Sequence, residues 1–364
     1  MPFATINKLF QMKFESLIIP GEIYLIGYFL AFALSFSTTL FLIKVPLNFT
    51  FNRFSTSEGG NVKSFGGFPV VLSFLITLWF FQLTGMVDSG NTPLVIIISV
   101  GAVVMMLLGF YDDITHCTPR IKLVVEILLA CILYYCGFQI ERIGDLIELG
   151  NFSILLTILW IVGITNAINL IDGMDGLAPG IIFFSCLTLI FVYLDREIIG
   201  ASFLAVILAG SVLGFFIFNF PPAKIILGDT GSLPLGLLVS MITLLPLNQG
   251  YTDEIYYLIP VITLLIPILD TSFAFFRRVA KGISPFLKDA DHFHHRLGKL
   301  GITPVKAISI LFLIGLYFDI TAMVTVYYIG LIPKLIPIYF VFIVINISVL
   351  ITILRQREKK HRNE

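Results

Sequence analysis

The stretch Ile-Gly-Ala-Ser-Phe-Leu-Ala-Val-Ile-Leu-Ala-Gly-Ser-Val-Leu-Gly-Phe-Phe-Ile-Phe, residues 199–218, contains no charged side chain. An α-helix needs roughly 20 apolar residues to cross the hydrocarbon core of a bilayer. This stretch therefore predicts a membrane-spanning helix. Ten other apolar runs reach or approach that length, at residues 23–43, 69–86, 93–110, 123–138, 152–168, 181–194, 233–247, 255–276, 307–328 and 336–354.

The composition of the whole chain supports the same interpretation. Hydrophobic residues make up 57% of the sequence and charged residues 13%, and the mean hydropathy is +0.98, far from the average of soluble proteins. We predict an all-α polytopic membrane protein with about eleven transmembrane helices. The shortest run, 181–194, has a re-entrant segment as its alternative. We expect residues 1–354 to form a single integral-membrane domain and residues 355–364 to form a basic cytoplasmic tail.

The distribution of Lys and Arg predicts the orientation. Loops after odd-numbered runs, together with the C-terminus, hold 18 of the 23 basic residues, and the other side keeps only Lys8, Lys13, Arg142, Arg196 and Lys334. Because basic loops stay in the cytoplasm, the C-terminus is expected there and the N-terminus outside. Four polar clusters then emerge on the cytoplasmic face, at residues 112–113, 166–175, 219–232 and 277–296. We predict that they build one site.

The first cluster is the adjacent pair Asp112 and Asp113, which follows the third run. Two neighbouring carboxylates repel each other unless a cation or a basic side chain lies near. Lys122, ten residues after Asp112, is the candidate partner, and it could instead hold a phosphate as a point charge. The alternative is an ordinary solvated helix end.

The second cluster ends the fifth run and reads Asn-Ala-Ile-Asn-Leu-Ile-Asp-Gly-Met-Asp-Gly from Asn166 to Gly176. Asn169, Asp172 and Asp175 are spaced three apart, which on a helix would place them on one face. The alternative is a turn whose Asn and Asp side chains are satisfied by their own backbone.

The third cluster contains Asp229, preceded by Gly228 and followed by Gly231 and Ser232, at the mouth of the eighth run. We expect a metal-binding carboxylate beneath the backbone N–H groups of a helix N-terminus, an arrangement that suits Mg²⁺ and a diphosphate. The alternative is a simple helix cap.

The fourth cluster packs three of the five histidines, His292, His294 and His295, next to Arg296. No cysteine lies near it and the spacing lacks a zinc clamp, so donors facing phosphate oxygens are favoured over a zinc site. Asp270 lies within an apolar run and is a further candidate because intramembrane carboxylates tend to be functional. The scattered basic residues do not favour nucleic acid as a partner.

In order and spacing, these clusters resemble the cytoplasmic motifs of the polyprenyl-phosphate N-acetylhexosamine-1-phosphate transferases, also called glycosyltransferase family 4. The matching motifs are Asp112-Asp113, the Asn166–Gly176 motif, Gly228-Asp229-x-Gly231-Ser232-x-x-x-Gly236 and the histidine loop. His-Phe-His-His-Arg-Leu in that loop is most like the branch that uses UDP-N-acetylglucosamine. In the loop after the first run, only Lys63 and Gly66-Gly67 match the family.

The resemblance implies transfer of N-acetylhexosamine 1-phosphate from a UDP-sugar to undecaprenyl phosphate, with release of UMP, at the bacterial inner membrane. It implies Mg²⁺ or Mn²⁺ as cofactor, with Asp229 and Asn169 as metal ligands, and it leaves a homodimer open. The catalytic positions that it implies are Asp112, Asp113, Lys122, Asp172, Asp175, His292, His294 and His295. The substrate-binding positions are Asn166, Asn169, Gly228, Ser232 and Arg296.

Two alternatives stay open at this point. A family member could act on the muramoyl-pentapeptide nucleotide instead. From a different class, a membrane transporter would use Asp270 and midplane glycines as a substrate path, although the acids gather at one membrane face.

Overall fold

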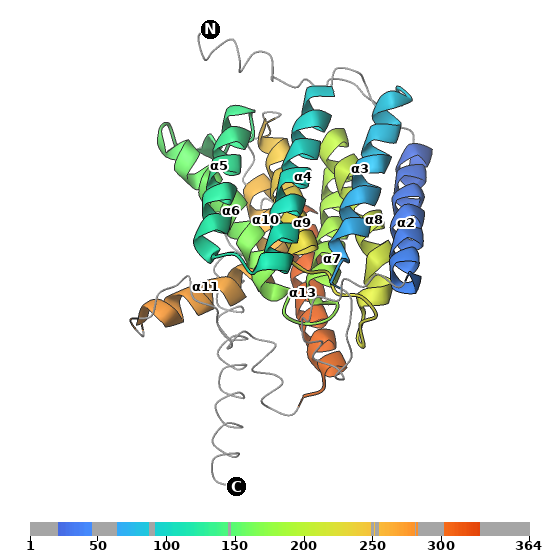
Figure 1. Cartoon of the computed structure of the whole chain (residues 1–364). Helices are drawn as coiled ribbons and strands as arrows, with labels where there is room; N and C mark the ends of the chain where they lie inside the picture. The colour runs from blue at the N-terminus through green and yellow to red at the C-terminus, as the bar shows by residue number, and fades with distance from the viewer. Residues whose placement is uncertain are drawn as a thin grey trace.

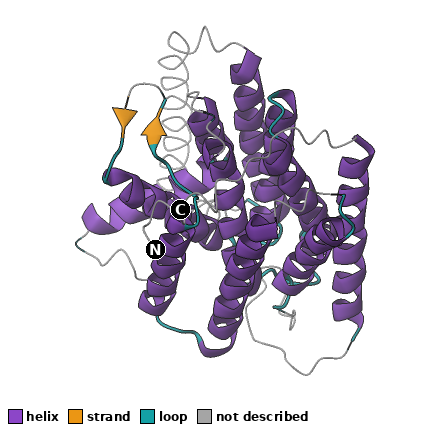
Figure 2. Cartoon of the chain, turned by 90° about the horizontal axis from the view of Figure 1, so that it is seen from above, coloured by secondary structure: helices purple, strands orange, loops and turns teal. Residues whose placement is uncertain are grey.

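The computed structural model describes residues 21–45, 64–86, 92–144, 147–248, 251, 255–280, 282 and 302–327. In this part of the chain the protein is a bundle of long helices with one short hairpin at its periphery (Figures 1 and 2). The helices are α2 (Gly21–Lys44), α3 (Gly67–Leu83), α4 (Thr92–Thr115), α5 (Pro119–Tyr135), α6 (Phe152–Ile171), α7 (Leu177–Asp195), α8 (Ile199–Asn219), α9 (Asp229–Asn248), α10 (Ile255–Thr263), α11 (Leu265–Ala280) and α13 (Pro304–Tyr327). The hairpin pairs β1 (Arg142–Ile143) with β2 (Ile147–Glu148) in antiparallel register.

The helices confirm the all-α polytopic fold. Seven described helices are long and apolar enough to cross a membrane, and the bent pair α10 and α11 raises the number to eight. Ten of the eleven predicted runs coincide with described helices, and the last, 336–354, lies outside the described residues. The run at 181–194 belongs to α7, a continuous helix of 19 residues, so the re-entrant alternative is wrong.

Helix α9 forms the centre of the bundle. In its most apolar 18-residue window, 94% of the residues are buried, and it packs mainly against α4 and α6. Close approach requires a small residue: a Cβ on Gly236 would lie 2.6 Å from the Cα of Thr165 on α6. The contact therefore depends on glycine at this position.

Helix α8 packs against α2, α7 and α9. Gly210 and Gly214 lie four apart on α8, and a Cβ on either would come within 2.6 Å of a backbone carbonyl oxygen of α2. Such small residues let membrane helices approach closely, where van der Waals packing replaces the hydrophobic effect as the driving force.

The ninth predicted run is not a single straight helix, because the chain bends by 72° between α10 and α11. Pro267 has no N–H to donate to the carbonyl of Thr263 four residues earlier. That carbonyl instead accepts a hydrogen bond from Ser185 Oγ on α7, at 3.1 Å. As a result α11 projects sideways from the bundle in Figure 1.

We call one end of the bundle the motif end: there α4, α6 and α8 finish and α3, α5 and α9 begin. Three of the four predicted clusters, at 112–113, 166–175 and 219–232, meet at this end, as the contacts described below show. The three described clusters therefore lie next to one another at the motif end.

Candidate functional site

Lys122 lies at the centre of the motif end. Its Nζ donates hydrogen bonds to Asp112 Oδ2 at 3.1 Å and to Asp229 Oδ2 at 2.8 Å. The ion pairs join α5 to the end of α4 and the start of α9, and the three side chains are 17%, 8% and 4% exposed, respectively. Buried charges of this kind are costly unless they are paired. The expected partnership of Lys122 with Asp112 is therefore present, and Asp229 shares it.

Asp113 has a different environment from its neighbour Asp112. Its carboxylate accepts hydrogen bonds from the backbone N–H groups of Asp229 (3.1 Å) and Thr230 (3.0 Å) and from the Thr230 hydroxyl (2.7 Å). It thus acts as an N-cap for α9, supplied by another helix.

This cap changes the interpretation of the α9 N-terminus. The N–H groups of Gly231 and Ser232 donate to the carbonyl of Gly228, at 3.0 and 2.9 Å. With Asp113 on the two preceding N–H groups, all four backbone donors of the first turn have protein acceptors. The expectation that these N–H groups bind a diphosphate was wrong. The Asp113 carboxylate already lies at the positive N-terminal end of α9, where the diphosphate was expected.

Glycines make this close contact between α4 and α9 feasible. Gly228 has φ +71°, and a Cβ there would lie 2.7 Å from Asp113 Oδ2. A Cβ on Gly109 of α4 would lie 2.1 Å from the carbonyl oxygen of Asp229. Gly228, predicted to bind substrate, therefore has a clear structural role in holding Asp229.

The pair Gly66-Gly67 supports the same loop from the other side. Their N–H groups donate to the carbonyls of Ile226 and Leu227, at 2.9 and 3.0 Å. A Cβ on Gly67 would lie 2.2 Å from the nitrogen of Gly231. These two glycines, noted in the sequence, thus pack directly against the loop that carries Asp229.

The two asparagines of α6 face the site from the last turns of that helix. Asn169 Nδ2 donates to Ser232 Oγ of α9 at 2.8 Å. Asn166 Nδ2 donates to the carbonyl of Val162 at 2.9 Å and to Glu126 Oε2 of α5. Because the amide nitrogens are engaged, both asparagines have a fixed orientation, with a carbonyl oxygen as the remaining polar atom.

A sequence model of glycosyl transferase family 4 matches residues 95–246. The phospho-N-acetylmuramoyl-pentapeptide-transferase of Thermotoga maritima is 30% identical over 295 residues, which cover 78% of this chain and 93% of that protein. The chain belongs to glycosyl transferase family 4. The matched residues run from the start of α4 to the end of α9 and contain every side chain described in the polar cluster so far.

Two other relatives carry different names. The probable undecaprenyl-phosphate N-acetylglucosaminyl 1-phosphate transferase of Bacillus subtilis is 38% identical over 232 residues, 62% of this chain and 64% of that protein. The decaprenyl-phosphate N-acetylglucosaminephosphotransferase of Mycolicibacterium smegmatis is 34% identical over 254 residues, 63% and 62%. The matched part of this chain thus covers slightly less than two thirds of the length of either relative. All three relatives are transferases by name, which favours a transferase over a transporter.

The predicted stripe of Asn169, Asp172 and Asp175 on one helical face was wrong. Helix α6 ends at Ile171, Asp172 is its C-cap residue, and Asp175 lies in the turn before α7. Gly176, with φ +79°, is the N-cap residue of α7. Both aspartates therefore lie beyond the end of α6, where the helical spacing no longer applies.

Asp175 connects this turn to the loop before α9. Its Oδ2 accepts from the N–H of Ala223 at 3.2 Å, and Asn219 Oδ1 accepts from the N–H of Gly176 at 2.8 Å. Asn219 Nδ2 in turn donates to the carbonyl of Ile225, at 2.8 Å. Asp175 and Asn219 are both buried, so these contacts tie two motifs of the family 4 chain together.

Glu126 is a buried carboxylate of this site that the sequence analysis missed. It lies one helical turn after Lys122 on α5 and is only 2% exposed. Its Oε2 accepts from Asn166, whereas its Oε1 has no hydrogen-bond partner among the described residues. A charged residue within the apolar run 123–138, four residues from a candidate lysine, was the signal that could have revealed it.

Cys117 lies in the loop between α4 and α5, next to Asp112. Burial, a hydrogen bond to Asp112 and the negative charge of that carboxylate raise the pKa of the Cys117 thiol to about 11. The thiol therefore stays protonated at neutral pH.

A divalent cation fits the donors at this site. No three His, Cys, Asp or Glu side chains converge as a metal site within the described part of the chain. Mg²⁺, however, is commonly held by one or two carboxylates together with substrate phosphates and water. The carboxylate of Asp229 and the oriented amide of Asn169 are hard oxygen donors of the required kind.

Four predicted site residues, His292, His294, His295 and Arg296, lie outside the described residues, as does Lys63. Asp270 is described and is buried on α11. The predictions for the histidine loop therefore stay predictions.

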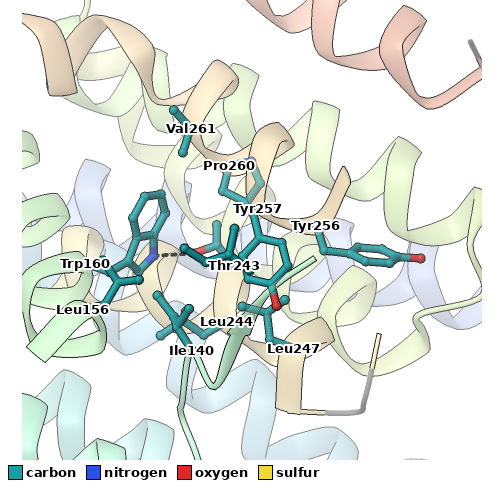
Figure 3. Close-up of a pocket in the computed structure, with 11 residues that line it drawn as sticks. Ile140, Leu156, Trp160, Thr243, Leu244, Leu247, Tyr256, Tyr257, Pro260 and Val261 are labelled. Atoms are coloured by element: carbon teal, nitrogen blue, oxygen red, sulfur yellow. Dashed lines mark hydrogen bonds between the residues drawn. The ribbon is translucent and has the colours of Figure 1, made fainter. Parts of the chain in front are cut away.

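A cavity of about 260 Å³ lies at the opposite end of α6 and α9 from the motif end. Its lining includes Trp160, Leu244, Tyr256 and Pro260, and Trp160 Nε1 donates to Thr243 Oγ1 at 3.0 Å (Figure 3). Its apolar walls contain none of the charged residues of the family 4 motifs, so the cavity is separate from the polar site.

Proposed function

We propose that the chain transfers an N-acetylhexosamine 1-phosphate, namely N-acetylglucosamine 1-phosphate, from its UDP-sugar to undecaprenyl phosphate and releases UMP. The bond formed joins an oxygen of the lipid phosphate to the phosphorus that carries the sugar, and the bond broken is the bridging P–O bond to UMP. The observation that carries the proposal is Lys122, held between Asp112 and Asp229 in a buried site of a family 4 protein.

On the acceptor side, Lys122 and Asp112 address the lipid phosphate. An ammonium group has three N–H donors, and among the described residues Lys122 donates two of them, to Asp112 and Asp229. The third can bind an oxygen of the acceptor phosphate. Phosphoryl transfer depends chiefly on positioning and charge neutralisation, and this lysine supplies both.

On the donor side, Asp229 and Asn169 would hold Mg²⁺ or Mn²⁺, which when bound neutralises charge on the diphosphate. Asp113 keeps Asp229 in place through the cap of α9, and Ser232 orients Asn169. Asp172, Asp175 and Asn166 would contribute to the nucleotide-sugar site. The roles predicted for the histidines and Arg296 at that site rest on the sequence alone. We further propose that the motif end faces the cytoplasm of a bacterial cell, with the C-terminus on that side.

The experiment is UMP release by the purified protein in detergent, with UDP-N-acetylglucosamine and undecaprenyl phosphate together and each alone. We expect release only with both substrates and none from the Asp229→Ala variant. Arg142→Ala is the matched control, because Arg142 forms an exposed ion pair in the hairpin, away from the motif end. UMP release without the lipid phosphate would contradict the proposal.

The second candidate is the muramoyl-pentapeptide nucleotide as donor. The observation that favours it is the 93% coverage of the Thermotoga maritima relative, against 64% for the more similar Bacillus subtilis relative. Both donors, offered separately in the same assay, distinguish the two candidates by their kcat/KM values.

A further inference from the structure

We propose that Glu126 is a positioning residue that fixes the amide of Asn166, so that the Asn166 carbonyl oxygen is presented to a hydrogen-bond donor of the nucleotide sugar. The inference rests on the proposed function and extends it to a side chain outside the family motifs. Glu126 does for Asn166 what Ser232 does for Asn169: each accepts from the amide nitrogen and so determines which way the oxygen points.

The geometry limits what Asn166 can do. Its amide nitrogen has two N–H donors, and the structure directs them to Glu126 on α5 and to the carbonyl of Val162 on its own helix. The Asn166 oxygen is then the atom left for a ligand. Since Asn166 and Asn169 are three apart on α6, both oxygens belong to one helical face.

The environment of Glu126 argues against a purely structural role. The side chain is almost fully buried, and its Oε1 lacks a hydrogen-bond partner among the described residues. A buried polar atom without a partner destabilises the fold, and a well-packed apolar side chain would often be better tolerated. Groups of this kind tend to be found at functional sites.

The position of Glu126 also makes it part of the charged cluster. Lys122 lies one turn earlier on α5, and the charges of Lys122 and Asp229 both act on the Glu126 carboxylate. Helix α5 thus contacts α4 and α9 through Lys122 and α6 through Glu126. A change at Glu126 should therefore act on the site without touching the caps that hold α9.

The first test compares Glu126→Leu, Glu126→Gln and Asn166→Ala. Loss of the acceptor in Glu126→Leu should raise KM for UDP-N-acetylglucosamine about tenfold, and Asn166→Ala should have the same effect. The double variant should be no worse than either single variant, because the two residues are expected to act as a unit. KM for undecaprenyl phosphate should not change. Glu126→Gln keeps an acceptor oxygen and should rescue most of the activity.

Stability separates this role from a structural one. The melting temperature of Glu126→Leu should be at or above that of the wild type, although its nucleotide-sugar binding is weaker. Gln82→Leu is the matched control: Gln82 is also buried on a helix, with an unpartnered Oε1 among the described residues, but it lies at the far end of α3. Its KM values should equal those of the wild type.

A reciprocal exchange tests the pair even if Glu126→Leu fails to fold. Asn166→Asp removes the amide donors and places two carboxylates together, so binding of UDP-N-acetylglucosamine should weaken. Adding Glu126→Gln restores a hydrogen bond with donor and acceptor exchanged and should recover part of the loss.

If Glu126→Gln alone is as impaired as Glu126→Leu, or if Glu126→Leu binds the nucleotide sugar normally, the positioning role is overturned. If wild-type protein shows no transfer at all, the proposed function fails instead.

Discussion

Asp113 accepts both the backbone N–H and the side-chain hydroxyl of Thr230, at 3.0 and 2.7 Å. The contact places a carboxylate from the end of α4 at the N-terminus of α9, the most buried of the described helices that are long enough to span a membrane. Asp112, its neighbour in sequence, binds Lys122 instead. Because successive residues on a helix point about 100° apart, the two aspartates serve different neighbours.

Asp113→Ala should therefore act mainly on stability. Removing the cap leaves the N–H groups of Asp229 and Thr230 without their acceptor, which costs about 1–2 kcal/mol or more for a buried cap. We expect a lower melting temperature and a weaker apparent affinity for Mg²⁺, since Asp229 loses its support. A thermal-shift assay in detergent measures the first effect, and metal titration of the activity measures the second.

Asp112→Asn is the matched comparison for Asp113. It should lose activity while its melting temperature stays close to that of the wild type. Thr230→Val should fall between wild type and Asp113→Ala in stability, because it removes one of the three hydrogen bonds. Equal melting temperatures for Asp113→Ala and Asp112→Asn would contradict the separation of roles.

Lys122→Ala should impair the acceptor side more than the donor side. Its ammonium holds Asp112 and Asp229 and has one further donor for the lipid phosphate. We expect KM for undecaprenyl phosphate to rise roughly tenfold or more and KM for the UDP-sugar to change less, as fits a lost contact to one substrate. Arg120→Ala is the control, because Arg120 is an exposed basic residue on the same turn of α5. An equal rise in both KM values would indicate a general structural role for Lys122.

Metal removal tests the donor side. Because Asp229 and Asn169 offer oxygen ligands, activity should be lost in EDTA and return with Mg²⁺ or Mn²⁺. Asn169→Ala should weaken Mn²⁺ binding, measured by electron paramagnetic resonance of the added ion, as well as activity. Glu148→Ala, an exposed acid of the hairpin, should leave both unchanged. Full turnover in EDTA would remove the assignment of these two residues as ligands.

The sequence predicted the helices better than the geometry of the site. Apolar length is a local property, so ten runs could be read directly, whereas the bend near Pro267 depended on Ser185 of α7 taking over the carbonyl of Thr263. The motif residues were found because charge and amide groups are conspicuous in an apolar chain. Of their partners, Lys122 was predicted from the sequence, whereas Glu126 was not, because its contact with Asn166 joins two separate helices.

Asp113 and Glu126 illustrate why the rest could not be predicted. Nothing in the sequence distinguishes Asp113 from Asp112, because the difference lies in which helix each side chain reaches. Glu126 stands alone in an apolar run, and only the position of Asn166 on another helix gives it a role. The spacing of Asp172 and Asp175 suggested a helical face, but α6 ends at Ile171, before either residue.

Cys117 provides a probe of the charge at Asp112. With its pKa raised to about 11, this thiol is mostly protonated at pH 8.5, and alkylation proceeds through the thiolate. Asp112→Asn removes the negative charge that disfavours a second one, so the pKa should fall and alkylation of Cys117 by iodoacetamide should accelerate. The measurement is the rate of modification of the Cys117 peptide by mass spectrometry between pH 7 and pH 10, with Cys131 followed in the same sample as the internal control. An unchanged rate in Asp112→Asn would show that burial alone sets the reactivity of Cys117.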